Sequence, residues 1–178
     1  MTPTVAKHRL FAWMEPGWLP DHQLIAFARG DDYFFGVMQS HIHEVWSDAQ
    51  GTQLREKESG RRYTPTTCFE TFPFPWPVNQ SDIPADKKDI HARISAAAER
   101  LDELRANWIN PEPGSISGRD LKRRTLTNLY NKRPTWLQNA CAELDSAVLE
   151  AYGWPMDIRN DEILEKLLDL NLARAAAE

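Results

Sequence analysis

The chain has 178 residues, of which 42% are hydrophobic, and its formal net charge is −5 at pH 7. This length and apolar content suit one domain or two small ones with a hydrophobic core, and the acidic balance excludes a global basic field that would attract nucleic acid, although a local basic patch can still bind it. The two cysteines, Cys68 and Cys141, stand outside any CxxC pair, and no apolar run approaches the ~20 residues that span a bilayer, so the sequence predicts a cytoplasmic protein with reduced thiols.

The N-terminal part of the chain predicts strands and one amphipathic helix. Residues 8–14 and 22–29 are short, aromatic-rich runs separated by a Pro-Gly turn signal, and we expect them to form two paired strands. From Asp31 or Asp32 to Gly51, apolar residues recur at spacings of three and four, which predicts a single amphipathic helix. A polar loop follows, and residues 62–69 then predict a strand that later prolines end.

Residues 61–77, RRYTPTTCFETFPFPWP, form a segment rich in aromatic residues and proline, which we call the strap. Its four prolines exclude a helix interior, because proline lacks the N–H donor and clashes with the preceding turn. An arginine pair stands at its front edge. We expect its aromatic side chains to anchor in a groove while the prolines fix the path; these are Phe69, Phe72, Phe74 and Trp76.

The remainder of the chain predicts helices. Residues 78–88 are polar and indicate a linker, and an apolar stripe then predicts a helix over 86–109, ended by residues 110–118. Further helices are expected at 119–130, at 135–152 with Gly153 just past the end, and at 160–177 with Asn160 or Asp161 as N-cap. The predicted fold class is therefore α+β, with a small β-containing piece at residues 1–80 and a mostly α-helical bundle at residues 81–178.

The residues that most resemble catalytic groups do not form a site. His41 and His43 lie two residues apart and so do not share a helix face, whereas metal-binding pairs on helices need a spacing of four, as in HExxH. We expect His41, on the apolar stripe, to be a core or interface histidine. The chain has no GxSxG, Walker or GxGxxG motif. Cys68, beside Phe69, is expected to be a structural thiol.

Positive charge gathers in two places. Residues 119–133, RDLKRRTLTNLYNKR, hold six lysines or arginines against one aspartate, and Arg61 and Arg62 stand beside Tyr63 and several threonines. Arginine, lysine, threonine and tyrosine side chains are the groups that hold phosphate oxygens on a duplex. A solvated helix face, with arginines stacked on the many tryptophans, explains the same composition.

Two long motifs resemble a known family. DDYFFGVMQSHIHEVW, with Asp31, Asp32, Tyr33, Gly36, Ser40, His43 and Trp46 at the matching positions, is followed by the strap. Together they resemble the end of the target-recognition region of MmeI-like adenine-specific DNA methyltransferases, the fused restriction-modification enzymes and their relatives. Residues 121–155 and a final EILEKLLDLNLAR helix resemble the helical tail of the same group, so the resemblance covers about residues 9–175. Residues 110–118 are shorter than the insertion that many relatives carry.

The resemblance implies a part of a larger enzyme. Such methyltransferases bind S-adenosylmethionine on a doubly wound sheet and use an Asn-Pro-Pro-Tyr type motif; this chain has neither that motif nor the glycine-rich cofactor loop. The implied function is a DNA-recognition and scaffolding fragment of a site-specific adenine-N6 DNA methyltransferase, with residues 1–80 ending the recognition domain and residues 81–178 forming the tail. We expect no catalytic residue, metal or cofactor in this chain. The implied partners are double-stranded DNA and the methyltransferase catalytic domain, missing here or encoded separately.

The expected DNA contacts come from the strap and the basic segment. They are Arg61, Arg62, Tyr63, Thr64, Thr66, Lys122, Arg123, Arg124, Lys132 and Arg133. Two other hypotheses stay open at this point. One is a protein-interaction subunit that docks onto a separate methyltransferase chain with little DNA contact, and the other is an independent enzyme of unknown type.

Overall fold

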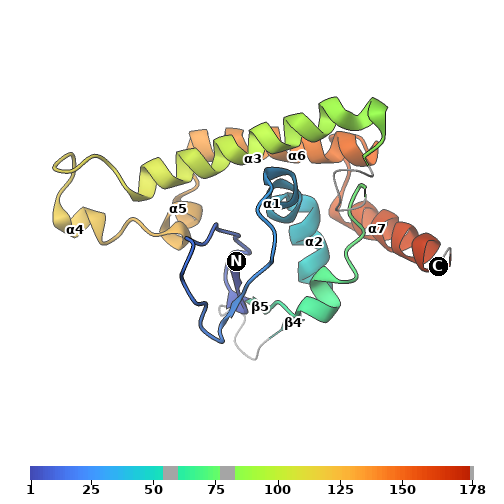
Figure 1. Cartoon of the computed structure of the whole chain (residues 1–178), viewed down its shortest axis with the longest axis horizontal. Helices are drawn as coiled ribbons and strands as arrows, with labels where there is room; N and C mark the ends of the chain where they lie inside the picture. The colour runs from blue at the N-terminus through green and yellow to red at the C-terminus, as the bar shows by residue number, and fades with distance from the viewer. Residues whose placement is uncertain (54–59, 77–82, 177–178) are drawn as a thin grey trace.

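The computed structural model describes residues 1–53, 60–76 and 83–176. Two long helices, α3 (Lys88–Ile109) and α6 (Thr135–Tyr152), run side by side along one edge of the molecule (Figure 1). Helix α1 (Asp32–Gln39) packs against both, while α2 (His41–Gln50) packs against α7 (Asn160–Ala175). A small β part lies at the side away from α3 and α6, so the predicted α+β class is confirmed.

The β part is built from two-residue strands. β1 (Thr2–Pro3) pairs antiparallel with β3 (Leu24–Ile25), and β5 (Arg61–Arg62) lies between β2 (Val5–Ala6) and β4 (Thr52–Gln53). The two small sheets meet at Thr4, whose N–H donates to the Gln23 carbonyl at 2.7 Å while its own carbonyl accepts from the Tyr63 N–H at 2.7 Å.

The predicted pairing of residues 8–14 with residues 22–29 is wrong. Residues 22–29 do contribute β3, but β3 pairs with β1, and residues 8–14 form no strand. Other groups occupy the backbone of residues 8–14: Phe11 donates its N–H to Gln39 Oε1 at 2.9 Å, and its carbonyl accepts from Arg105 Nη2 at 2.6 Å. Side chains from α1 and α3 thus replace a β ladder here.

The predicted single helix over residues 31–51 is also wrong, because it breaks at Ser40. Asp31 caps α1 as expected, accepting the Phe34 N–H at 2.9 Å. Ser40 has an extended backbone, with φ −68° and ψ 156°, and is both the C-cap of α1 and the N-cap of α2. The carboxylate of Asp145 in α6 accepts the His41 N–H at 2.7 Å and so satisfies the first turn of α2. The break leaves His41 exposed and buries His43. His41 is therefore not the core histidine that was one expectation, whereas its contact with Asn160 of α7 at 2.9 Å agrees with the alternative of an interface histidine.

The strap leaves the strand after residue 62, which corrects the prediction of a strand at 62–69. A short π-type turn, η2 (Pro65–Phe69), follows β5 and is closed by the Glu70 N–H donating to the Pro65 carbonyl at 2.9 Å. Phe72, Phe74 and Trp76 are buried as predicted, and Phe69 packs half-buried against the core; Pro77 lies outside the described residues.

Helices α6 and α7 hold the strap through its carbonyls. Tyr152 Oη donates to the Pro73 carbonyl at 2.8 Å, and Arg174 Nη1 donates to the Phe74 carbonyl at 2.7 Å. Asn171 Nδ2 donates to the Thr71 carbonyl at 2.5 Å. The strap prolines have no N–H groups of their own, so at these positions only the carbonyls need partners, and donors of this kind supply them.

The helical part follows the predictions at its long helices and departs from them at the short ones. Helices α3 and α6 are confirmed, with Gly153 ending α6 at φ 71°. Residues 119–130 are not one helix: α4 (Gly118–Leu121) ends in a turn and α5 (Leu126–Lys132) begins after it, with Thr125 Oγ1 accepting the Asn128 N–H at 3.2 Å. Helix α7 is capped by Arg159, not by Asn160 or Asp161. A 3₁₀ turn, η4 (Ala85–Lys87), precedes α3; residues 78–82 of the predicted linker lie outside the described residues.

One hydrophobic cluster joins the two parts of the chain. It contains Phe34 and Val37 from α1, Ile94 from α3 and Leu144 from α6. Gly36 allows α1 to approach α3 closely, because a Cβ there would lie 2.9 Å from Ile94 Cγ2. The division into a recognition part and a tail at residue 80 stays a prediction. No helix in the described residues is long and apolar enough to cross a membrane.

Candidate nucleic-acid interface

Strand β5 sends the side chains of the arginine pair to opposite faces, as alternation along a strand requires. Arg61 faces α2, where its guanidinium donates to the Asp48 carbonyl and lines a cavity with His41 and Glu44. Arg62 lines a groove of about 450 Å³ on the other face, together with His22 and Gln23. Both side chains are exposed, but no hydrogen bond or ion pair joins the Arg62 side chain to any residue that the structure describes. Only Arg62 of the pair is therefore free to meet a ligand.

The other predicted strap residues do not share that face. Tyr63 is 2% exposed, its hydroxyl lies 3.0 Å from His43 Nε2, and burial raises its pKa above the usual value. Arg9 covers the ring of Tyr63 from 4.9 Å. Thr64 is half-buried, and its carbonyl accepts the Cys68 N–H at 2.8 Å, whereas Thr66 is exposed. The burial of Tyr63 does not fit direct contact with a phosphate.

The basic segment of residues 119–133 likewise contains both exposed cations and an arginine that is bonded inside the fold. Lys122, Arg123 and Lys132 are exposed. Arg124 instead stacks on Trp108 at 5.1 Å from the ring and donates to the Trp108 carbonyl at 2.6 Å, which closes the turn after α3. For Arg124, the alternative hypothesis of an arginine stacked on a tryptophan is therefore right.

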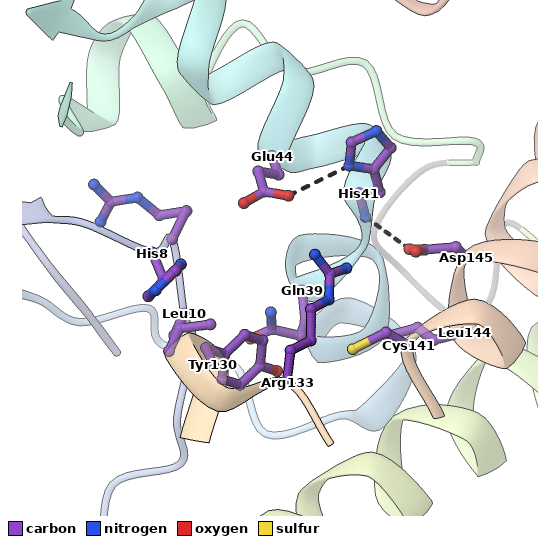
Figure 2. A pocket seen from close by; sticks show the side chains of 11 residues that line it. His8, Leu10, Gln39, His41, Glu44, Tyr130, Arg133, Cys141, Leu144 and Asp145 are labelled. Atoms are coloured by element: carbon purple, nitrogen blue, oxygen red, sulfur yellow. Dashed lines mark hydrogen bonds and ion pairs between the residues drawn. The ribbon is translucent and has the colours of Figure 1, made fainter. Parts of the chain in front are cut away.

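Arg133 has an unusual backbone. It is the C-cap of α5 with φ 43° and ψ 60°, and it is the one non-glycine residue with positive φ in the described part of the chain. Its side chain extends into a pocket, and its guanidinium lies toward His41 and Glu44 (Figure 2).

This pocket, which we call the Arg133 pocket, has a volume of about 300 Å³. It lies among the N-terminal segment, α2, α5 and α6 (Figure 2). Its polar lining residues are His8, Arg9, Gln39, His41, Glu44, Tyr130, Arg133, Cys141 and Asp145. The hydroxyl of Tyr130 is buried beside the thiol of Cys141, and no nitrogen or oxygen of the described residues is bonded to it.

The acidic groups of the Arg133 pocket are engaged by His41. The His41 ring lies 3.3 Å from Glu44 Oε2 and 2.9 Å from Asn160 Oδ1, and the hydrogen bond with Glu44 raises the pKa of His41 to about 9. His41 therefore carries a positive charge at neutral pH. The half-buried Asp145 accepts the His41 N–H, and partial burial raises the pKa of Asp145 above its ordinary value.

Arg9, by contrast, has only neutral hydrogen-bond partners, and the carboxylates of Asp48 and Glu44 act on it from a distance. It is 8% exposed, and its guanidinium donates to Thr2 Oγ1 at 3.1 Å, to the Pro3 carbonyl and to the Arg61 carbonyl at 3.0 Å. Burial lowers the pKa of Arg9. A guanidinium nevertheless stays protonated in proteins near neutral pH, so Arg9 carries a positive charge.

The N-terminal segment connects the two basic regions. Lys7 and His8 directly follow β2, the strand that pairs with Arg61 and Arg62. Lys7 Nζ and His8 Nε2 each lie 2.9 Å from Asn131 Oδ1 in α5. Sequence reasoning missed Lys7, His8 and Arg9. The signal that could have found them is the consecutive Lys-His-Arg at residues 7–9.

The described residues hold no group of three or more His, Cys, Asp or Glu side chains that could bind a metal ion. Cys68 is fully buried, with its sulfur 3.8 Å from the Ser47 carbonyl, which suits a structural thiol. Cys141 is half-buried in the Arg133 pocket, and burial raises the pKa of its thiol.

Comparisons with known proteins give one informative likeness. No family model and no curated protein matches the chain. A solved structure of the Type IIL restriction-modification enzyme MmeI in complex with DNA superposes on 83% of this chain with a TM-score of 0.60 and 23% sequence identity. The chain spans 17% of the length of that enzyme. At this identity the likeness establishes a shared fold with part of a restriction-modification enzyme.

Proposed function

We propose that the chain is a DNA-interacting and scaffolding part of a restriction-modification enzyme. The observation that carries this proposal is the fold that it shares with a part of MmeI, an enzyme solved in complex with DNA. The motif resemblance at residues 31–46 and 61–75 agrees with the same relation. The exposed cations Arg62, Lys122 and Arg123 offer the charge that a duplex backbone requires.

The finer part of the proposal concerns the enzyme as a whole. In it, the chain ends the target-recognition region and forms the helical tail of an adenine-N6 methyltransferase. The catalytic domain that binds S-adenosylmethionine is then a separate part, which this chain positions on the DNA. The strap supports such a scaffolding role, because its aromatic side chains pack in the core and the carbonyls of Thr71, Pro73 and Phe74 accept hydrogen bonds inside the fold.

The test is fluorescence anisotropy of labelled duplex DNA across a salt series. The wild-type chain is expected to bind with an affinity that falls steeply as salt rises, because cations on a DNA-binding face release counterions. Arg62→Gln should lower the salt slope by about 1, as expected when one phosphate contact is lost.

Arg61→Gln is the matched control, since it removes the same charge from the other face of the same strand. It should leave the slope closer to the wild-type value. No binding at low salt would contradict the proposal, and equal slopes for the two variants would contradict the assignment of Arg62.

A second candidate function rests on a different surface. Trp18 and Leu19 are 71% and 94% exposed, and they follow a turn in which Trp18 N–H donates to the Glu15 carbonyl at 3.2 Å across Pro16 and Gly17. A projecting apolar tip of this kind suits docking onto another protein chain. Absence of DNA binding, together with loss of binding to a purified catalytic subunit in Trp18→Ser, would favour this protein-interaction role.

A further inference from the structure

The Arg133 pocket is lined by more cations than carboxylates: Arg9, Arg133 and the protonated His41 against Glu44 and Asp145. Burying a guanidinium is costly unless it is paired, and Arg9 has only neutral oxygens as partners. Arg133 makes no side-chain hydrogen bond or ion pair with the described residues, although it reaches into the same pocket. Two arginines therefore line one cavity, and no carboxylate of the described residues forms a hydrogen bond or ion pair with either side chain.

The acidic residues in the pocket do not supply that partner. Glu44 is paired with His41, which is protonated at neutral pH. One oxygen of Asp145 is bound by the His41 N–H at the start of α2, so this carboxylate is already used inside the fold. Cys141 is a neutral thiol near pH 7, because burial raises its pKa. The remaining charge of the pocket is therefore positive.

The backbone conformation of Arg133 also supports a ligand site in this pocket. Helices commonly end in a left-handed residue, and that residue is usually glycine because a Cβ is disfavoured there. Helix α6 follows this rule with Gly153 at φ 71°, whereas α5 ends with Arg133 at φ 43°. The chain accepts strain at this position and thereby aims a long cation into the pocket. Strained residues of this kind cluster at functional sites.

We propose that the Arg133 pocket binds one phosphate group, held by Arg133 and by the field of Arg9. The buried hydroxyl of Tyr130 offers a further donor to the phosphate oxygens. This inference rests on the proposed function, because it names a phosphate of the DNA backbone as the source. A free phosphate compound would use the same chemistry, and the two sources are separated below.

The first experiment measures thermal stability of the purified chain with and without inorganic phosphate, at constant ionic strength. Phosphate should raise the unfolding midpoint of the wild type and of Lys132→Gln, which removes an adjacent exposed charge outside the pocket. It should not raise the midpoint of Arg133→Gln or Arg133→Gly. Arg133→Gly should fold with a midpoint at or above that of the wild type in phosphate-free buffer, since glycine relieves the left-handed strain.

The second experiment uses Cys141 as a reporter of the pocket. A maleimide reagent should modify Cys141 slowly, while the fully buried Cys68 is protected by the fold. Duplex DNA should slow the modification of Cys141 in the wild type and in Lys132→Gln. Arg133→Gln should lose this protection and bind DNA about fivefold more weakly at fixed salt, as expected for one lost charge-assisted contact.

The outcomes separate this inference from the proposed function. If the wild type and both Arg133 variants respond alike to phosphate and DNA, the pocket is not a phosphate site, while salt-dependent DNA binding would leave the proposed function standing. If phosphate stabilises the wild type only through Arg133 but no DNA binds, the pocket stands as a site for a free phosphate compound and the proposed function fails.

Discussion

The strap and the basic segment at residues 119–133 look alike in sequence as candidate DNA contacts, but the structure uses them in opposite ways. The strap turns inward: Phe72 and Phe74 are buried, and its carbonyls accept hydrogen bonds from Tyr152 and Arg174. The basic segment stays at the surface, where Lys122, Arg123 and Lys132 are exposed. Arginine count alone therefore does not identify a binding surface; the partner of each guanidinium does.

The same distinction applies within each region. Arg61 and Arg124 donate to backbone carbonyls and close parts of the fold, whereas Arg62 and Arg133 make no such bond with the described residues. We expect the two bonded arginines to act on stability and the two free ones to act on ligand binding. Substitutions in the two regions test this division between bonded and free arginines.

The largest effect is expected in the strap. Phe72→Ala removes a buried ring that meets His43 edge-on at 4.8 Å and Phe74 at 5.1 Å between ring centres. We expect the free energy of unfolding, measured in urea, to fall by about 3–5 kcal/mol through lost burial and cavity formation. Leu19→Ala, at a side chain that is 94% exposed, is the control and should change it by less than ~0.5 kcal/mol. Equal, small effects would contradict an internal strap.

The next effect concerns pH and the histidine beneath the strap. His43 is fully buried, and burial lowers its pKa to about 3. The unfolded chain binds a proton on this histidine below pH ~6.5 whereas the folded chain does not, so the stability is complete above ~6.5 and falls as the pH drops toward 3. We expect a loss of a few kcal/mol over that range.

Urea unfolding at several pH values measures this dependence. His43→Phe should flatten it, although its packing also changes. His22→Gln should keep it, since His22 is an exposed histidine whose side chain is 84% accessible. If stability stays level between pH 6.5 and 4 in the wild type, the buried neutral state of His43 is wrong.

The smallest effect on stability is expected in the basic segment. The double variant Lys122→Gln, Arg123→Gln should change the free energy of unfolding by less than ~0.5 kcal/mol, because both side chains are exposed. The same variant should lower the salt slope of DNA binding by about 2. Arg124→Gln should lower the free energy of unfolding by about 1 kcal/mol, because it loses the hydrogen bond to the Trp108 carbonyl, and should leave the salt slope of DNA binding nearly unchanged. A stability loss above ~1 kcal/mol in the double variant would show that Lys122 and Arg123 stabilise the fold, contrary to this expectation.

Features set by local pattern could be predicted from the sequence. The apolar stripe of α3, the glycine that ends α6 and the burial of the strap aromatics depend on spacing and side-chain type, and all three were predicted. The break at Ser40 could not be, because Asp145 binds the His41 N–H from 104 residues away. The strand partners also escaped prediction, since two-residue strands leave no alternating pattern.

For the candidate site, too, the sequence predicted local features but not tertiary contacts. The six basic residues at 119–133 were visible as a cluster, but their partners were not. That Arg124 covers Trp108 depends on a contact across 16 residues, and that Arg133 meets Arg9 at one pocket depends on the fold of the whole chain. Local sequence locates charge, while tertiary structure decides whether that charge is already used.

The salt dependence of duplex DNA binding by three chains shows whether the free arginines, and not the bonded ones, contact DNA. The first is the wild type. The second, the free-cation variant, combines Arg62→Gln, Arg123→Gln and Arg133→Gln. The third, the bonded-cation variant, combines Arg61→Gln and Arg124→Gln. We predict steep salt-dependent binding by the wild type, a slope lowered by about 3 in the free-cation variant, and a nearly unchanged slope in the bonded-cation variant once folding is verified. Absence of binding by the wild type at low salt, or equal losses of slope per arginine in both variants, would contradict the account.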